Sequence, residues 1–203
     1  ADRVVQLRSS TGNWQWSLQV QAPNIIPNIE GNEEFDYGYG GSVFWKTVGG
    51  FSIGTAYNSS VIDRITPAMR AQGLTGDSQA AVIGVQWEHP RWFLSGTAHL
   101  SENHEADAKD QYFDARGYEA YGSYILTPKW MVRGGYNDLK PTNDSYNGRT
   151  HRQEIYFSLQ YMLKRKLLDD LIYLEYKWDQ GERYNGESGK NLLLVGIRYN
   201  LTY

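Results

Sequence analysis

The chain of 203 residues contains no cysteine. A disulfide framework, a thiolate metal site and a cysteine nucleophile are therefore excluded. The chain also lacks any run of about 18 apolar residues, the length that a membrane-spanning helix requires, and its mean hydropathy is −0.60. Neither sign of charge predominates, because the chain contains 20 Lys and Arg and 23 Asp and Glu. This balance argues against a nucleic-acid-binding protein, since phosphate neutralisation needs clustered Lys and Arg.

Proline is scarce, with 6 residues, whereas Tyr, Trp and Gly are abundant, with 16, 7 and 21 residues. Aromatic residues and glycine are enriched together in β-barrels, where rings lie at membrane interfaces. The first residues, ADRVVQLRSS, are polar, so they show no signal-peptide pattern. We expect either a mature chain or one that starts part-way into a longer protein.

Period-two alternation is the dominant pattern along the chain. In the stretch WQWSLQVQA, Trp14–Ala22, the even positions are all apolar and the odd positions are all polar. A strand sends these two classes to opposite faces, whereas a helix would mix them around its circumference.

The same alternation predicts about eleven strands, all-β structure and a single domain over residues 1–203. The one candidate for a short helix is Thr66–Gln72, within a loop. The expected strands are Val4–Ser10, Trp14–Ala22, Tyr37–Lys46, Phe51–Tyr57, Val82–Glu88, Trp92–Ser101, Gly117–Leu126, Trp130–Asn137, Ile155–Leu163, Ile172–Trp178 and Leu192–Tyr203.

The expected connections alternate strictly between short and long. The short ones are Thr11–Asn13, Val48–Gly50, His89–Arg91, Thr127–Lys129 and Lys164–Asp169. The long and polar ones are Pro23–Glu34, Asn58–Gln79, Glu102–Arg116, Asp138–Gln153 and Asp179–Asn191. This alternation predicts a transmembrane, antiparallel, up-and-down β-barrel with tight turns on one side of the membrane.

Aromatic residues cluster at the ends of the expected strands, on the apolar face. Two such clusters predict aromatic girdles at the two membrane interfaces. The tryptophans assigned to the girdles are Trp14, Trp16, Trp45, Trp87, Trp92, Trp130 and Trp178.

The polar face of each strand is then expected to line the interior. Mixed charges and small polar residues there predict a water-filled channel, with no cofactor and no metal site, in which opposed charges order water and filter solutes. The residues expected to line the channel are Arg8, Gln19, Asp36, Lys46, Glu88, His99, Glu119, Arg133, Glu175, Lys177 and Arg198.

Catalysis finds little support in the sequence. His99 shares its strand face with Ser95 and Thr97, but residues of one strand do not by themselves form a nucleophile–base pair. His104 and Glu105 fall in an expected polar loop without metal-ligand spacing. The basic stretch Gly148–Arg152 is a candidate contact for lipopolysaccharide phosphates.

Three stretches carry a resemblance to a known family. They are RVVQLRSSTGNWQWSLQVQ, YGYGGSVFWKTVGGFSIGTAYNSS and LLLVGIRYNLTY. The chain resembles the C-terminal eleven strands of a general diffusion porin of the Gram-negative outer membrane. Arg8 matches the second arginine of the motif after that family's constriction loop, but Ser9 replaces a tyrosine there and no proline follows.

The resemblance implies an outer-membrane channel rather than an enzyme, for passive diffusion of small hydrophilic solutes and ions. It implies a homotrimer in contact with membrane lipid and lipopolysaccharide. It also implies a sixteen-stranded barrel, of which this chain lacks five N-terminal strands and the constriction loop that Arg8 would face. The ending resembles the assembly signal of the family through Tyr199, Leu201 and Tyr203.

Three alternatives remain open at this point. One is a smaller, substrate-selective barrel of about twelve strands for oligosaccharides or anions, which an aromatic slide or a one-sided basic lumen would favour. Another is an outer-membrane barrel hydrolase that depends on His99. The last is a plugged structural barrel that conducts no ions. The solute and the charge selectivity do not follow from the sequence.

Overall fold

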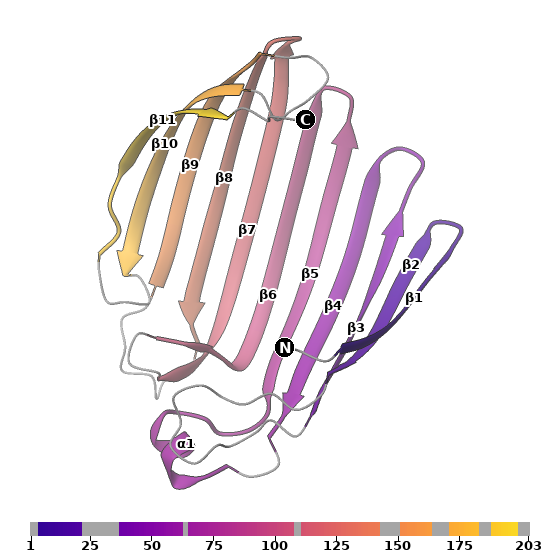
Figure 1. The fold of residues 1–203 in the computed structure, drawn as a ribbon, viewed down its shortest axis with the longest axis vertical. Coiled ribbons are helices and arrows are strands. Elements are labelled where there is room, and N and C mark those ends of the chain that lie inside the picture. Colours follow the sequence, from indigo (N-terminus) through magenta and orange to yellow (C-terminus); the bar gives the residue numbers. More distant parts are fainter. Residues whose placement is uncertain are drawn as a thin grey trace, which may run out of the picture.

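The computed structural model describes residues 4–21, 37–62, 65–107, 111–142, 151–163, 171–182 and 188–198. These residues form one antiparallel sheet of eleven strands, in which each strand pairs with its neighbours in sequence (Figure 1). The all-β, up-and-down topology predicted from the alternation is confirmed. The strands are β1 (Val4–Thr11), β2 (Trp14–Gln21), β3 (Tyr37–Lys46), β4 (Phe51–Val61), β5 (Ser78–His89), β6 (Trp92–Ala106), β7 (Tyr112–Thr127), β8 (Trp130–Pro141), β9 (His151–Met162), β10 (Leu171–Glu182) and β11 (Leu192–Arg198).

Short turns close the hairpins at one end of the sheet. Between β1 and β2, Thr11 pairs with Trp14, so only Gly12 and Asn13 lie in the turn. Gly12 has a φ of +57°, and a two-residue hairpin needs a positive φ at this first turn position to match the twist of its strands. Between β7 and β8, the Thr127 hydroxyl accepts hydrogen bonds from the backbone N–H groups of Lys129 and Trp130, at 3.3 and 3.1 Å.

The opposite end of the sheet carries a small folded cap. The helix α1 (Pro67–Ala71) begins after Thr66, whose hydroxyl accepts a hydrogen bond from the Met69 backbone N–H at 3.3 Å. This confirms the short helix expected within that loop. Met69 and Leu74 are fully buried against Ile62, and this cluster forms an apolar core beneath the cap.

Four of the expected long loops are shorter in the structure, because the flanking strands extend into them. The strand β4 ends at Val61 and β5 starts at Ser78, β8 ends at Pro141 and β9 starts at His151, and β10 ends at Glu182. The expected loop Glu102–Arg116 is largely strand, because β6 continues to Ala106 and β7 starts at Tyr112. A register shift between Ser101 and Glu105 marks a bulge in this hairpin. The backbone ladder continues because its hydrogen bonds need no apolar side chains, whereas the alternation that revealed the strands ends at the polar residues.

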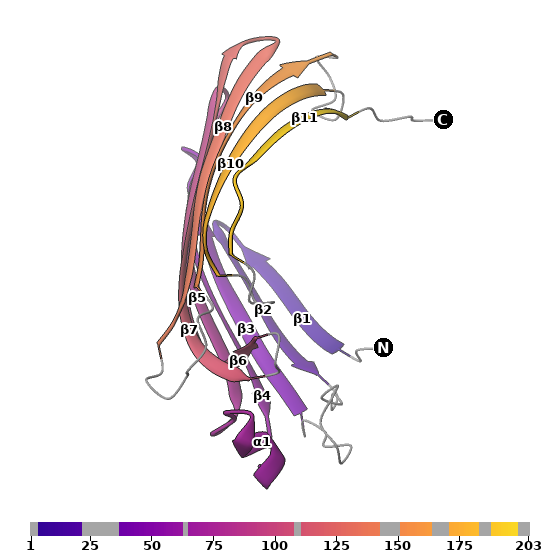
Figure 2. The ribbon, with the colours of Figure 1, turned by 90° about the vertical axis from the view of Figure 1, so that its left-hand side faces the viewer.

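The sheet is strongly curved, and its two edge strands bend toward the same side (Figure 2). β1 and β11 each pair with a single neighbour and not with each other in the described residues. The sheet is therefore an open, curved wall rather than a closed barrel. Among the residues that the structure describes, no helix has the length and apolarity to cross a membrane.

Candidate channel wall

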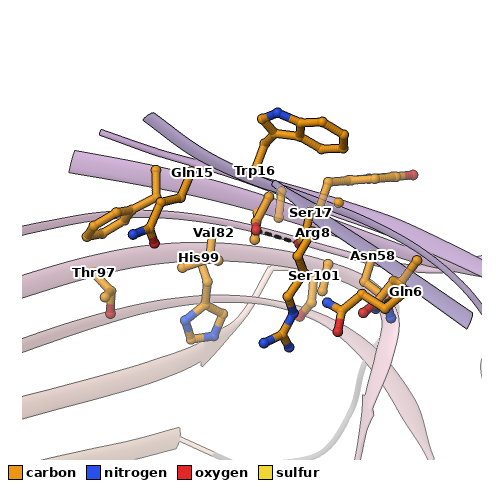
Figure 3. Close-up of a pocket in the computed structure, with 18 of the residues that line it drawn as sticks. Gln6, Arg8, Gln15, Trp16, Ser17, Asn58, Val82, Thr97, His99 and Ser101 are labelled. Atoms are coloured by element: carbon orange, nitrogen blue, oxygen red, sulfur yellow. Dashed lines mark hydrogen bonds between the residues drawn. The ribbon is translucent and has the colours of Figure 1, made fainter. Parts of the chain in front are cut away.

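The two faces of the sheet differ in chemistry. Arg8, Thr97 and His99 extend from one side of the sheet into the concave space, whereas Trp16 extends from the opposite side (Figure 3). On the outer face, large apolar side chains are exposed along the whole sheet, with Leu18 at 57% and Val195 at 76% exposure. A continuous apolar surface of this kind requires an apolar environment. We call the concave side the inner wall.

A hollow of about 990 Å³ lies on the inner wall over β1–β7. Arg8 and His99 lie in the same register row, and the positions between them hold only Ser17, Ser42, Ala56 and Val82. These side chains are short, so they leave open space between the basic edge strand and His99. The hydroxyls of Ser17 and Ser42 are hydrogen-bonded at 2.8 Å, and Gln19 donates to the Asn58 side-chain oxygen at 3.4 Å.

His99 and Glu119 lie on the far side of this hollow. The His99 ring covers Gly117, and a Cβ at that position would overlap the ring. The cross-strand neighbours of His99 are Val82 and Gly117. In the described part of the chain, His99 therefore has no nucleophile or carboxylate opposite it in the register.

Several charged side chains of the inner wall form ion pairs with one another. Lys46 contacts Glu88 at 2.9 Å, and both side chains are about half exposed, at 49% and 46%. Lys177 contacts Glu154 at 2.7 Å, and Arg152 contacts the same carboxylate at 3.0 Å. Sequence reasoning placed Lys46, Glu88 and Lys177 on this wall but did not identify their partners, because the pairs depend on the register between strands.

Arg133 and Glu175 lie in one register row, separated by Ser158. The Arg133 Nε is buried and has no hydrogen-bond partner. No ion pair joins these two charges within the described residues, in contrast to the pairs around Glu88 and Glu154. Arg198, the last described residue, pairs with Leu171 of β10.

A row of inward-facing aromatic rings was missed by the sequence analysis. The ring centroids of Phe93 and Tyr121 are 5.6 Å apart, and those of Tyr121 and Tyr156 are 6.3 Å apart. The alternation of polar and apolar residues puts Tyr121 and Tyr156 on the polar face of their strands. Their contact across Gly135 could be found only from the register of β7, β8 and β9.

Aromatic pairs line the outer face near the short turns. Trp14 and Trp45 have ring centroids 6.2 Å apart, and Trp87 and Trp92 are 4.4 Å apart. Trp130 contacts Tyr161 at 4.9 Å. Trp16 is exposed on this face, and Trp178 is exposed near the other end of β10.

Four predicted site residues lie outside the described residues. They are Asp36 of the expected channel lining and Tyr199, Leu201 and Tyr203 of the expected assembly signal. The expected turn Lys164–Asp169 also lies outside, as does most of the basic stretch Gly148–Arg152.

The described residues contain no cluster of three or more His, Asp or Glu side chains that could hold a metal ion. His104 and Glu105 lie in the β6 extension rather than in the expected loop, and their side chains are 3.3 Å apart. The hydrogen bond to Glu105 raises the pKa of His104, while burial opposes the shift. A histidine–carboxylate pair by itself contains no nucleophile.

Known structures share this fold. The chain matches Salmonella typhi OmpF, solved in complex with daunomycin, with a TM-score of 0.76 and 16% sequence identity. The match covers 97% of this chain and 61% of the OmpF chain. The NanC porin, solved in a rhombohedral crystal form, matches with a TM-score of 0.50 and 14% identity, covering 98% of this chain and 93% of NanC.

No protein-family model and no curated protein sequence matches the chain. The likeness to the two porin structures, at this low identity, shows the fold. The chain has a porin-type fold, and the resemblance noted in the sequence is confirmed at that level.

Proposed function

We propose that the chain forms the wall of an outer-membrane porin that lets small hydrophilic solutes and ions diffuse passively. One observation carries the proposal: a single sheet of porin fold has a polar, charged concave wall and an apolar outer face. Water and ions require the first surface, and lipid requires the second. On this proposal the eleven channel-lining residues predicted from the sequence face the pore, and the protein is not an enzyme.

We propose that the complete barrel has more strands than the eleven of this sheet. The TM-score is 0.76 against OmpF, of which the chain spans 61%, and 0.50 against NanC, of which it spans 93%. This difference favours a large barrel of about sixteen strands over the twelve-stranded alternative. In lipid, the open edges of β1 and β11 would leave unpaired backbone groups, each costing several kcal/mol. We therefore propose that residues 1–203 are part of one barrel domain that further strands complete.

The outer face supports a membrane location. Exposed Trp14, Trp87 and Trp130 near the short turns and Trp178 near the opposite strand end fit two aromatic girdles at lipid interfaces. We propose contact with outer-membrane lipid and lipopolysaccharide on this face, assembly as a homotrimer, and recognition of Tyr199, Leu201 and Tyr203 during barrel assembly.

The proposal is tested by ion conductance across planar lipid bilayers containing the assembled channel of which this chain is part. We expect stepwise, ohmic currents without any energy source. The absence of current from correctly assembled protein would overturn the proposal and favour a plugged barrel.

A matched variant separates the channel from the hydrolase alternative. His99→Ala should keep the stepwise currents, because His99 only lines the wall. An esterase assay on the same preparation should detect no hydrolysis by the unmodified protein. Hydrolysis that disappears in His99→Ala would identify an enzyme instead.

A further inference from the structure

Three aromatic rings form a continuous strip on the inner wall, at β6, β7 and β9. We call Phe93, Tyr121 and Tyr156 the aromatic strip. The rings of Tyr121 and Tyr156 are inclined by only 35° to each other, and Phe93 meets Tyr121 edge to face at 61°. All three side chains are half-buried, so part of each ring remains accessible from the concave side.

No side chain separates the rings of Tyr121 and Tyr156, because the residue between them is a glycine. Gly135 lies between Tyr121 and Tyr156 in the register of the sheet. A Cβ at Gly135 would overlap the Tyr156 ring, which leans across this position. Glycine therefore allows the two tyrosines to approach each other across an intervening strand.

Polar groups with unused hydrogen-bonding capacity flank the strip on both sides. Glu119 lies in the next inward-facing row from Tyr121, two residues toward the long loops. Arg133 and Glu175 lie in the next inward-facing row on the other side, two residues toward the short turns. No hydrogen bond or ion pair occupies Glu119, Arg133 or Glu175 within the described part of the chain, and the Arg133 Nε is buried without a partner.

We propose that the aromatic strip with its flanking charges is a binding site for neutral saccharides on the channel wall. The flat faces of pyranose rings are apolar and pack on aromatic rings, whereas their hydroxyls extend around the edge and need hydrogen-bond partners. Glu119 and Glu175 accept such hydrogen bonds, and Arg133 donates them. This inference rests on the proposed channel only for solute access from water.

The mixture of charges selects against other solutes. An anion on the strip would meet Glu119 and Glu175, and a cation would meet Arg133 and Lys177, which is the cross-strand neighbour of Tyr156. A flat apolar solute would cover these charged groups without satisfying their hydrogen bonds, which is unfavourable. A neutral, polyhydroxylated ring avoids both penalties.

The test measures equilibrium binding of maltotriose to the assembled protein in detergent micelles, by saturation-transfer NMR titration. Tyr156→Leu removes one ring of the strip and should weaken binding about tenfold. Tyr156→Phe keeps the ring and should bind within about twofold of the unmodified protein. Phe157→Leu is the matched control, because Phe157 is the next residue but is exposed on the outer face, at 56%. It should leave binding unchanged.

Sorbitol has hydroxyls but no ring face, and it should show no saturable binding. Absence of maltotriose binding, or equal loss in Tyr156→Leu and Phe157→Leu, would overturn the inference. Tyr121→Leu provides a second test of the strip if Tyr156→Leu does not assemble. Bilayer conductance, measured separately, reports on the proposed channel: current without saccharide binding would reject the binding site alone, and binding without current would reject the channel alone.

Discussion

At the residue scale, Asn103 connects the cap to the sheet. It is buried, has a positive φ of 50°, and lies at the bulge of β6. Its side chain accepts a hydrogen bond from the Thr75 backbone N–H at 3.1 Å and donates to the Asp77 carbonyl at 3.1 Å. Its own backbone N–H donates to the Asp114 carboxylate at 2.9 Å. The sequence alone placed Asn103 in a loop, and only the fold shows that it joins three segments.

We predict that Asn103→Ala destabilises the protein by about 2 kcal/mol, because three side-chain hydrogen bonds are lost and alanine disfavours a positive φ. The measurement is the free energy of unfolding in urea, with the protein in lipid vesicles. Asn103→Gly is the control, since glycine accepts the positive φ and loses only the hydrogen bonds. It should be the less destabilised variant. Equal stability of both variants and the unmodified protein would contradict this role.

The Glu154 carboxylate forms ion pairs with two cationic side chains on the inner wall. Its carboxylate contacts Lys177 at 2.7 Å and Arg152 at 3.0 Å. Sequence reasoning assigned Lys177 to the pore but omitted Glu154, which it placed at the border of a predicted loop. The pairing appears only when β9 and β10 are aligned.

We predict that Glu154→Gln shifts the channel toward anions, because it removes the negative charge of the carboxylate that contacts Lys177 and Arg152. The shift should be clear in the reversal potential measured at about 0.1 M KCl and largely lost at about 1 M, where the screening length falls to about 3 Å. Gln153→Glu is a control, because Gln153 contacts Tyr136 of the outer-face register row and its new charge would not face the pore. An unchanged reversal potential in Glu154→Gln at low salt would contradict this prediction.

At the element scale, alternate residues of each strand face two different environments, the outer face and the inner wall. β10 shows this clearly, because Leu174 is exposed on the outer face at 47%, and its neighbour Glu175 faces the inner wall. Parity could be predicted from the sequence for nearly every strand, since successive side chains must point to opposite faces.

We predict that Leu174→Arg destabilises the barrel by about 2–4 kcal/mol, the penalty for arginine at the lipid midplane. Glu175→Arg, one residue further, should change stability by less than about 1 kcal/mol because that position faces water. Urea unfolding in lipid vesicles measures both variants. Equal destabilisation would show that the outer face does not contact lipid.

The sequence predicted the position of a short turn correctly but placed the ends of two strands too early. The turn at Gly12 was evident from the sequence, because a tight hairpin needs such a residue. The ends of β6 and β8 were predicted too early, since their backbone pairing continues to Ala106 and Pro141 through polar residues. Hydropathy reports the environment of side chains, and it does not report where a backbone ladder stops.

At the scale of the whole molecule, the curved sheet presents all its polar rows to one concave space. The absence of cysteine from the chain makes this arrangement directly testable, because a single introduced thiol has no competing background. Leu18 and Gln19 are adjacent in β2 and lie on opposite faces.

We predict that Gln19→Cys reacts with a charged, membrane-impermeant methanethiosulfonate and that the reaction changes the single-channel current. Leu18→Cys should react at least about tenfold more slowly, because lipid disfavours the reactive thiolate. Mass spectrometry of the labelled protein gives both rates. Similar rates for the two positions would contradict a lipid-facing outer surface.

The sequence by itself determined the all-β architecture, the number and order of strands, and the face on which Arg8, His99 and Trp16 lie. These features follow from local alternation, which needs no knowledge of distant residues. The tertiary structure decided which residues meet across the sheet: Lys177 with Glu154, and Tyr121 with Tyr156 over Gly135. Those contacts depend on the register and curvature of neighbouring strands, because a shift by one residue exchanges the two faces and all the partners on them.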